Sequence, residues 1–231
     1  DPVVVISNAA IQGSVIDSAS GAGLSGAAVR FSGNTLTTDS QGLYSQASSA
    51  PVARMVIEGA ATGFESIFGV AEVLGSVPSV NNLRLTPLGT AATITVASGG
   101  TVTQAATGAS VSVPANALVA AGGGAAPATA DVRVTAIDIG SDSNLLSGDF
   151  TDSSGTQVQA YGSVVLSSST ALDVVGGQLL TLQIPLSNRS ALTPASATLY
   201  YLDVATGRWV ADGSANLVAG AVILALGVSG L

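Results

Sequence analysis

The chain has 231 residues and a formal net charge of −8, from 6 basic and 14 acidic residues. All six basic residues are Arg, and the sequence contains no Lys, His or Cys. These absences exclude disulfides, metal sites built from Cys or His, and nucleophilic catalysis with a His or Lys base. The acidic balance and the scattered Arg residues argue against nucleic-acid binding, which needs clustered cations.

The N-terminal residues 1–10 form a predicted extended arm. Val3, Val4, Val5 and Ile6 are a β-branched run with strong strand preference. An apolar strand outside a domain needs a partner. Two interpretations remain open: the run adds a strand to a neighbouring molecule, or it pairs with its own domain.

Short alternating segments with intervening turns follow the arm and predict a β domain over residues 11–90. Residues 39–42 (Asp-Ser-Gln-Gly) are typical of a tight turn, in which Asp accepts a local backbone bond and Gly supplies the unusual φ. The predicted strands are residues 11–17, 27–31, 54–58, 64–70 and 80–86.

A family resemblance covers residues 11 to about 88. The residues that carry it are Ile11, Gly13, Val15, Asp17, Leu24, Gly26, Ala27, Val29, Thr38, Asp39, Gly42, Tyr44, Gly63 and Phe64. In this order they resemble the carboxypeptidase regulatory-like domain. The resemblance implies a seven-stranded transthyretin-like or Ig-like sandwich that serves as a structural or adhesive accessory. Some related pilin domains carry a Lys–Asn isopeptide bond, which this Lys-free chain cannot form.

The remainder, residues 91–231, predicts a second β domain. Its predicted strands are residues 93–96, 109–113, 131–137, 157–166, 179–184, 198–203 and 217–226. The segments that carry a resemblance are residues 111–118 (VSVPANAL), 148–150 (GDF), 182–186 (LQIPL), 199–203 (LYYLD), 206–209 (TGRW) and Gly213. Together they resemble the extracellular β domain of astroprincin-type proteins, which is related to the ZU5-like fold. The family continues past its last strand with an aromatic segment, which residues 222–226 (VILAL) replace.

The predicted fold class is therefore all-β, with two β-sandwich-like domains. Residues 213–231 carry no charge over 19 positions, which approaches the length of a membrane span. Gly220 and Gly227 interrupt the apolar centre of this segment, and no basic flank follows it. A final β-strand is therefore the favoured interpretation, and no membrane span is expected.

One acidic segment carries the oxygen ligands that Ca²⁺ prefers. Its candidate ligands are Asp138, Asp142, Asn144, Asp149 and Asp152. The spacing is not that of an EF-hand, since no Glu closes a twelve-residue loop. An Asp-rich solvated turn is the competing interpretation. No other cofactor is expected.

The missing bases and nucleophiles predict a protein that is not an enzyme. We expect a secreted, cell-surface structural protein that forms a head-to-tail homopolymer by β-strand exchange through its apolar terminal strands. A surface with few charges suits such contacts, because close packing then desolvates few ions. The alternative is a cell-surface adhesin or a module that binds carbohydrate or Ca²⁺.

Overall fold

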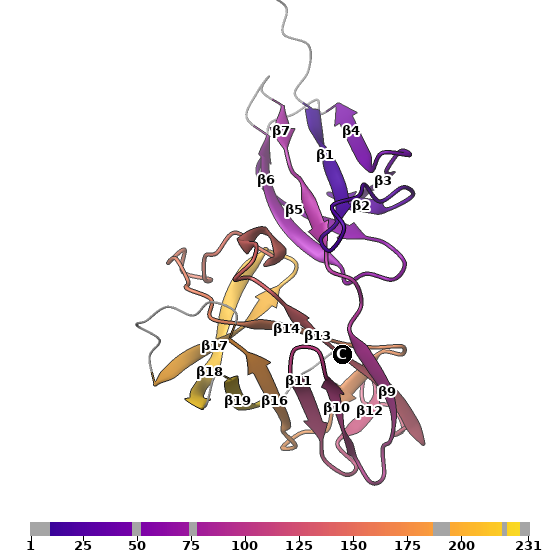
Figure 1. The fold of residues 1–231 in the computed structure, drawn as a ribbon, viewed down its shortest axis with the longest axis vertical. Helices are drawn as coiled ribbons and strands as arrows, with labels where there is room; N and C mark the ends of the chain where they lie inside the picture. Colours follow the sequence, from indigo (N-terminus) through magenta and orange to yellow (C-terminus); the bar gives the residue numbers. More distant parts are fainter. Residues whose placement is uncertain (1–9, 48–51, 74–77, 187–194, 219–220, 227–231) are drawn as a thin grey trace, which may run out of the picture. The chain divides into compact units, whose positions relative to one another are not determined.

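Figure 1 shows the computed structural model, which describes residues 10–47, 52–73, 78–186, 195–218 and 221–226. Within these ranges the regular structure consists of strands and one 3₁₀ turn, η1 (Ser143–Leu145), without an α-helix. No helix in the described ranges is long and apolar enough to cross a membrane.

The chain forms two compact units that are not simple halves of the sequence. The first unit contains residues 1–87 together with the segments 144–159 and 200–211. The second contains residues 88–143, 160–199 and 212–231. The predicted domains, 11–90 and 91–231, differ from these units at the two inserted segments, which the sequence had assigned to the second domain.

Two sheets make up the first unit. One has the order β4-β1-β7, with β8 also on β1, and the other has the order β3-β2-β5-β6. Their strands are β1 (Ala10–Asp17), β2 (Ala28–Phe31), β3 (Asn34–Thr37), β4 (Leu43–Ala47), β5 (Val52–Ala60), β6 (Ile67–Val73), β7 (Ser79–Val80) and β8 (Leu83–Leu85). Both β7 and β8 pair in parallel with β1 and continue one register, so they act as a single interrupted strand. The sandwich therefore has seven strand positions.

Alternation along the strands builds the core of the first unit. On β5, for example, Met55 and Ile57 are buried, whereas Arg54 and Val56 lie on the outer face. The buried apolar residues of this core are Ile11, Val15, Ala27, Val29, Phe31, Tyr44, Met55, Ile57, Ile67, Ala71, Val73, Leu83 and Leu85.

Gly13 and Tyr44 meet at the interruption between β7 and β8. A Cβ atom on Gly13 would lie 1.7 Å from the carbonyl oxygen of Asn81, so only glycine permits this approach. The Tyr44 hydroxyl donates a hydrogen bond of 2.7 Å to the same carbonyl. Burial of this side chain raises the pKa of Tyr44.

The second unit has a six-stranded sheet of order β10-β11-β16-β19-β18-β17, a sheet β14-β13-β9 and a pair β12-β15. Its strands are β9 (Thr90–Thr95), β10 (Gly100–Gln104), β11 (Ala109–Val113), β12 (Leu118–Ala120), β13 (Thr129–Ile137), β14 (Ser163–Ser168), β15 (Leu172–Val174), β16 (Leu180–Pro185), β17 (Ser196–Asp203), β18 (Arg208–Val218) and β19 (Ala221–Leu226). Both β17 and β18 run on into the first unit, which holds residues 200–211. The main buried residues are Ile94, Val96, Val102, Val111, Val113, Leu118, Val132, Val134, Leu172, Leu180, Leu182 and Ile184.

The all-β class with sandwich-like domains is thus confirmed, and several predicted strands need correction. The predicted strand at 80–86 is interrupted between β7 and β8, and the one at 64–70 is β6, which starts at Ile67 and ends at Val73. The predicted strand at 157–166 starts only at Ser163, because residues 153–162 form turns and irregular chain. The predicted strand at 217–226 is instead the end of β18 and the separate strand β19, which pair with each other in antiparallel fashion. The turn at 39–42 is confirmed: the Asp39 side chain accepts from the Gln41 N–H at 2.8 Å, and Gly42 has a φ of 79°.

Candidate functional site

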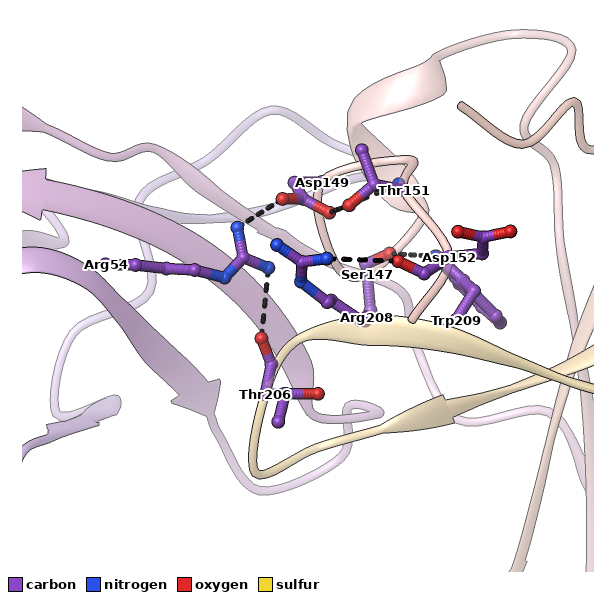
Figure 2. A network of polar contacts seen from close by, with 8 residues as sticks. All are labelled: Arg54, Ser147, Asp149, Thr151, Asp152, Thr206, Arg208 and Trp209. Carbon is purple, nitrogen blue, oxygen red and sulfur yellow. Dashed lines mark hydrogen bonds and ion pairs between the residues drawn. The ribbon is translucent and has the colours of Figure 1, made fainter. Parts of the chain in front are cut away.

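A polar cluster of the first unit lies on the outer face of β5 and β6. Two segments far away in the sequence, residues 144–159 and 200–211, form it with Arg54 of β5. We call these two segments the clasp. Figure 2 shows the side chains that build it.

Arg54 joins both segments of the clasp. One end of its guanidinium forms an ion pair with Asp149, and its Nη2 donates to the carbonyl oxygen of Thr206 at 3.0 Å. The side chains of Arg54 and Asp149 are only 28% and 26% exposed. Because the pair is partly shielded from water, its attraction is stronger than that of an open surface pair.

Gly207 brings the hairpin between β17 and β18 onto the outer face of the sheet. It is buried, has a φ of 66°, and donates its N–H to the carbonyl of Asp203 at 2.7 Å. A Cβ atom added at Gly207 would lie 2.7 Å from Val70 and 3.2 Å from Val56. This close approach, together with the left-handed φ, requires glycine at the tip of the hairpin.

Trp209 fastens the two segments of the clasp to each other. Its indole Nε1 donates to the carbonyl of Ser147 at 3.2 Å, and its backbone N–H donates to the carbonyl of Thr151 at 2.9 Å. The neighbouring Gly148 donates its N–H to the carbonyl of Phe68 at 2.6 Å. The Phe68 N–H in turn donates to the Ser147 hydroxyl at 3.1 Å. Ser147 and Gly148 therefore satisfy the backbone N–H and C=O groups of Phe68 at the edge of β6, which would otherwise face water.

Arg208 and Asp152 add a backbone link between the same two segments. The Arg208 Nη1 donates to the carbonyl oxygen of Asp152 at 3.3 Å. Asp152 and Trp209 also form a parallel β-bridge. The guanidinium of Arg208 thus binds a backbone carbonyl of the neighbouring segment rather than presenting its charge to an anionic ligand.

Three carboxylates of the clasp are held in their ionised forms. Partial burial acts to raise the pKa of Asp149, but hydrogen bonds from Arg54 and Thr151 outweigh it and lower the pKa. A hydrogen bond from the Ser154 hydroxyl, with one from the Thr156 N–H, lowers the pKa of Asp152. Hydrogen bonds from Thr206 and Ala205 lower the pKa of Asp203 in the same way.

The predicted calcium ligands are divided between the two compact units. Asp138 and Asp142 belong to the second unit, whereas Asn144, Asp149 and Asp152 belong to the first. Across the described ranges, no three Asp, Glu, His or Cys side chains are placed to hold a metal ion.

The carboxylates at the two ends of the acidic segment, those of Asp138 and Asp152, accept hydrogen bonds from nearby backbone N–H groups. The Asp152 side chain accepts from the backbone N–H groups of Ser154 at 2.9 Å and Thr156 at 2.8 Å. The Asp138 side chain accepts from the Ser141 N–H at 3.3 Å. These are the bonds of Asp turns, which is the competing interpretation.

The other predicted site, the assembly strand Val3, Val4, Val5 and Ile6, lies outside the described residues. The first described residue of β1 is Ala10, which pairs with Ala47 of β4, and Ile11 pairs with Ser79 of β7. The arm therefore precedes a central strand of its sheet, not an edge strand.

A second feature is the outer face of β10, β11 and β16 in the second unit. Cross-strand pairs place Thr101 opposite Ser112, and Thr181 follows Ser112 on the next strand. The hydroxyls of Thr101 and Ser112 are 2.8 Å apart. The remaining residues of this face are Thr103, Ser110 and Gln183. The face thus carries hydroxyl and amide groups without a charge.

Comparisons with known proteins assign no family. No family model matches the chain, and no curated protein matches it. A solved structure of a proposed carbohydrate-binding protein from Bacteroides uniformis aligns with 11% identity over 96% of this chain and 99% of that one, at a TM-score of 0.27. A proposed membrane-associated protein of unknown function from Bacteroides fragilis gives 8% identity, 94% and 97% coverage, and a TM-score of 0.28.

A DUF3823 family protein from Bacteroides uniformis is similar at the same level. It has 10% identity over 91% of this chain and 99% of that one, at a TM-score of 0.25. Scores this low carry neither a family nor a function to this chain.

The sequence pointed to several residues of the clasp for other reasons. Asp149 and Asp152 stood out as calcium ligands, and Trp209 as a residue after a hairpin turn. Arg54 gave no signal, since a single Arg on a strand is ordinary on a solvated face. With 6 basic and 14 acidic residues, the sequence does not show which acid pairs with Arg54.

Proposed function

We propose that the chain is a non-catalytic structural protein of the cell surface, a subunit of an extracellular filament joined by β-strand exchange. The observation that carries the proposal is the uncharged outer face of β10, β11 and β16, on which the hydroxyls of Thr101 and Ser112 are 2.8 Å apart. Such a face can be covered by another subunit without desolvating an ion. The resemblances at 11–88 and 91–231 belong to the same proposal, as accessory and extracellular β domains.

The N-terminal arm supplies the exchanged strand in this proposal. Its run of Val3, Val4, Val5 and Ile6 can add backbone hydrogen bonds to an open sheet edge of the next subunit. A head-to-tail contact whose rotation does not close into a ring produces a filament. The arm precedes β1, whose described residues already pair with β4 on one side and with β7 on the other.

Electron microscopy of the native protein tests the proposal. Removal of residues 1–9 keeps β1 intact, because β1 starts at Ala10. We expect filaments from the whole chain and folded monomers from the shortened one. Filaments that survive the removal would refute strand exchange through the arm.

Two variants of the arm separate the contribution of its apolar run from that of its charge. In an extended strand Val3 and Val5 lie on one face, and Val4 and Ile6 on the other. Replacing Val3 and Val5 by Asp should abolish filaments, and replacing Asp1 by Asn should leave them intact. Loss of filaments in the Asp1→Asn variant would attribute the effect to charge and not to the apolar run.

A carbohydrate-binding module is the second candidate, favoured by the hydroxyl and amide groups of the same face. These groups can exchange hydrogen bonds with a hydroxyl-rich polymer. Binding of insoluble polysaccharides by the whole chain and by the variant Thr101→Val, Thr103→Val distinguishes this candidate. Equal binding by both proteins, or none by either, would remove it.

A further inference from the structure

We infer that the clasp makes the folding of residues 1–87 depend on the rest of the chain, so that the protein unfolds in one cooperative step. The connectivity is the first argument. The chain passes between the two compact units after residues 87, 143, 159, 199 and 211, which is five times. Two domains joined by a simple linker are connected once, and each can then unfold alone.

The strands of the clasp hairpin carry the second argument. Both β17 and β18 run from the second unit into the first as continuous strands. Melting of either strand in one unit therefore removes its continuation in the other. Strands that share hydrogen-bonded neighbours behave as one unit in local unfolding.

The contacts of the clasp give the third argument. If the clasp leaves the outer face of β5 and β6, Arg54 loses Asp149 and the Thr206 carbonyl. The pair Val56 and Val70 loses the cover of Gly207 at the same time. A cation without its partner and an uncovered apolar pair both disfavour an intact first unit with a detached clasp.

The chain contains its own reporter for this inference. Trp209 is the single Trp of the sequence, and it lies within the clasp. Its fluorescence follows the clasp, while far-UV circular dichroism follows the strands of both units. Coincident transitions from different probes are the standard test of two-state unfolding.

The first experiment compares the two probes during urea unfolding of the whole chain, at several protein concentrations so that any assembly is recognised. We expect one transition with the same midpoint for both probes. A fluorescence transition at lower urea than the circular dichroism transition would overturn the inference, because the clasp would then open alone. Two circular dichroism transitions would overturn it as well.

The second experiment adds a methyl group under the hairpin. Gly207 and Gly108 occupy the same kind of turn: each N–H bonds to the carbonyl four residues earlier, at 2.7 Å to Asp203 and 2.9 Å to Gln104. Their φ values are 66° and 78°. A Cβ atom would meet Val70 at 2.7 Å in the first case and nothing within 4 Å in the second. Gly108→Ala therefore reproduces the backbone strain of Gly207→Ala without its clash.

We expect Gly207→Ala to favour the unfolded state about tenfold more than Gly108→Ala does, with both probes shifted together. Equal shifts in the two variants would overturn the role of the clasp contact. Early loss of Trp209 fluorescence with unchanged circular dichroism in Gly207→Ala would overturn the coupling. If Gly207→Ala fails to fold while Gly108→Ala folds, the dependence of the chain on the clasp is supported, and the two-probe comparison of the unaltered chain then decides the coupling.

Discussion

Two outer sheet faces of this protein differ in their residues and in what covers them. The outer face of β5 and β6 carries Arg54, Val56 and Val70, and the clasp covers it. The outer face of β10, β11 and β16 carries Thr, Ser and Gln, and Thr101, Thr103, Thr181 and Gln183 on it are exposed. The difference teaches that a branched apolar pair beside a cation needs cover from the chain, whereas hydroxyls are satisfied by water and by one another.

The sharpest way to break the covered face is Arg54→Ala. The change leaves the partly shielded Asp149 without its cation and the Thr206 carbonyl without its donor. Loss of such a partner costs about 1–3 kcal/mol, and more when a charge is left behind. Urea unfolding followed by circular dichroism measures the loss in the free energy of unfolding.

The matched control is Arg30→Ala, at a second ion pair of the first unit. Arg30 contacts Glu58 at 2.9 Å, but its side chain is 48% exposed. Exposed pairs contribute about 0–1 kcal/mol. A loss from Arg30→Ala as large as that from Arg54→Ala would contradict the comparison between covered and open surfaces.

A smaller effect is expected from Trp209→Phe. The variant keeps an aromatic ring but removes the Nε1–H donor to the Ser147 carbonyl. The net contribution of one hydrogen bond is about 0.5–1.5 kcal/mol. Circular dichroism gives the midpoint, since the reporter itself is lost. Tyr201→Phe, at a residue that is 52% exposed, should change stability by less than about 0.5 kcal/mol.

Much of the sandwich could be predicted because alternation and turn chemistry act locally. The strand at 109–113 appears with its predicted bounds, and the turn at Asp39 forms as its Asp and Gly indicate. The strand predicted at 217–226 failed for a local reason as well: an apolar run with a central Gly fits a hairpin as readily as a single strand.

The clasp could not be predicted, because its contacts join residues far apart in the sequence. Arg54 and Asp149 are separated by 95 positions, and Arg54 and Thr206 by 152. No periodicity or turn signal spans such separations. For the same reason the sequence shows the oxygen chemistry of Asp149, which predicts a calcium ligand, but it does not show the Arg54 guanidinium with which Asp149 pairs.

Acid offers a graded test of the covered face. The folded pKa values of Asp149, Asp152 and Asp203 lie below the unfolded value of about 3.9. Their hydrogen bonds therefore stabilise the fold fully above that pH, and this stability is lost as the pH falls through the lower folded values. Thermal unfolding between pH 6 and pH 2 should show a falling melting temperature below about pH 4. Asp149→Asn should flatten that fall, and identical pH profiles for the two proteins would contradict the assignment.

The open face should give the smallest response. Thr101→Val with Ser112→Ala removes the hydroxyl pair at 2.8 Å from a surface that water already reaches. Because water satisfies groups on an exposed surface, we expect the free energy of unfolding to change by less than about 0.5 kcal/mol. Urea unfolding of the dilute protein measures it. A loss greater than about 1 kcal/mol in the monomer would mean that the face is packed within the chain. A small loss in the monomer together with weaker assembly would instead place the partner of this face outside the molecule, in the next subunit.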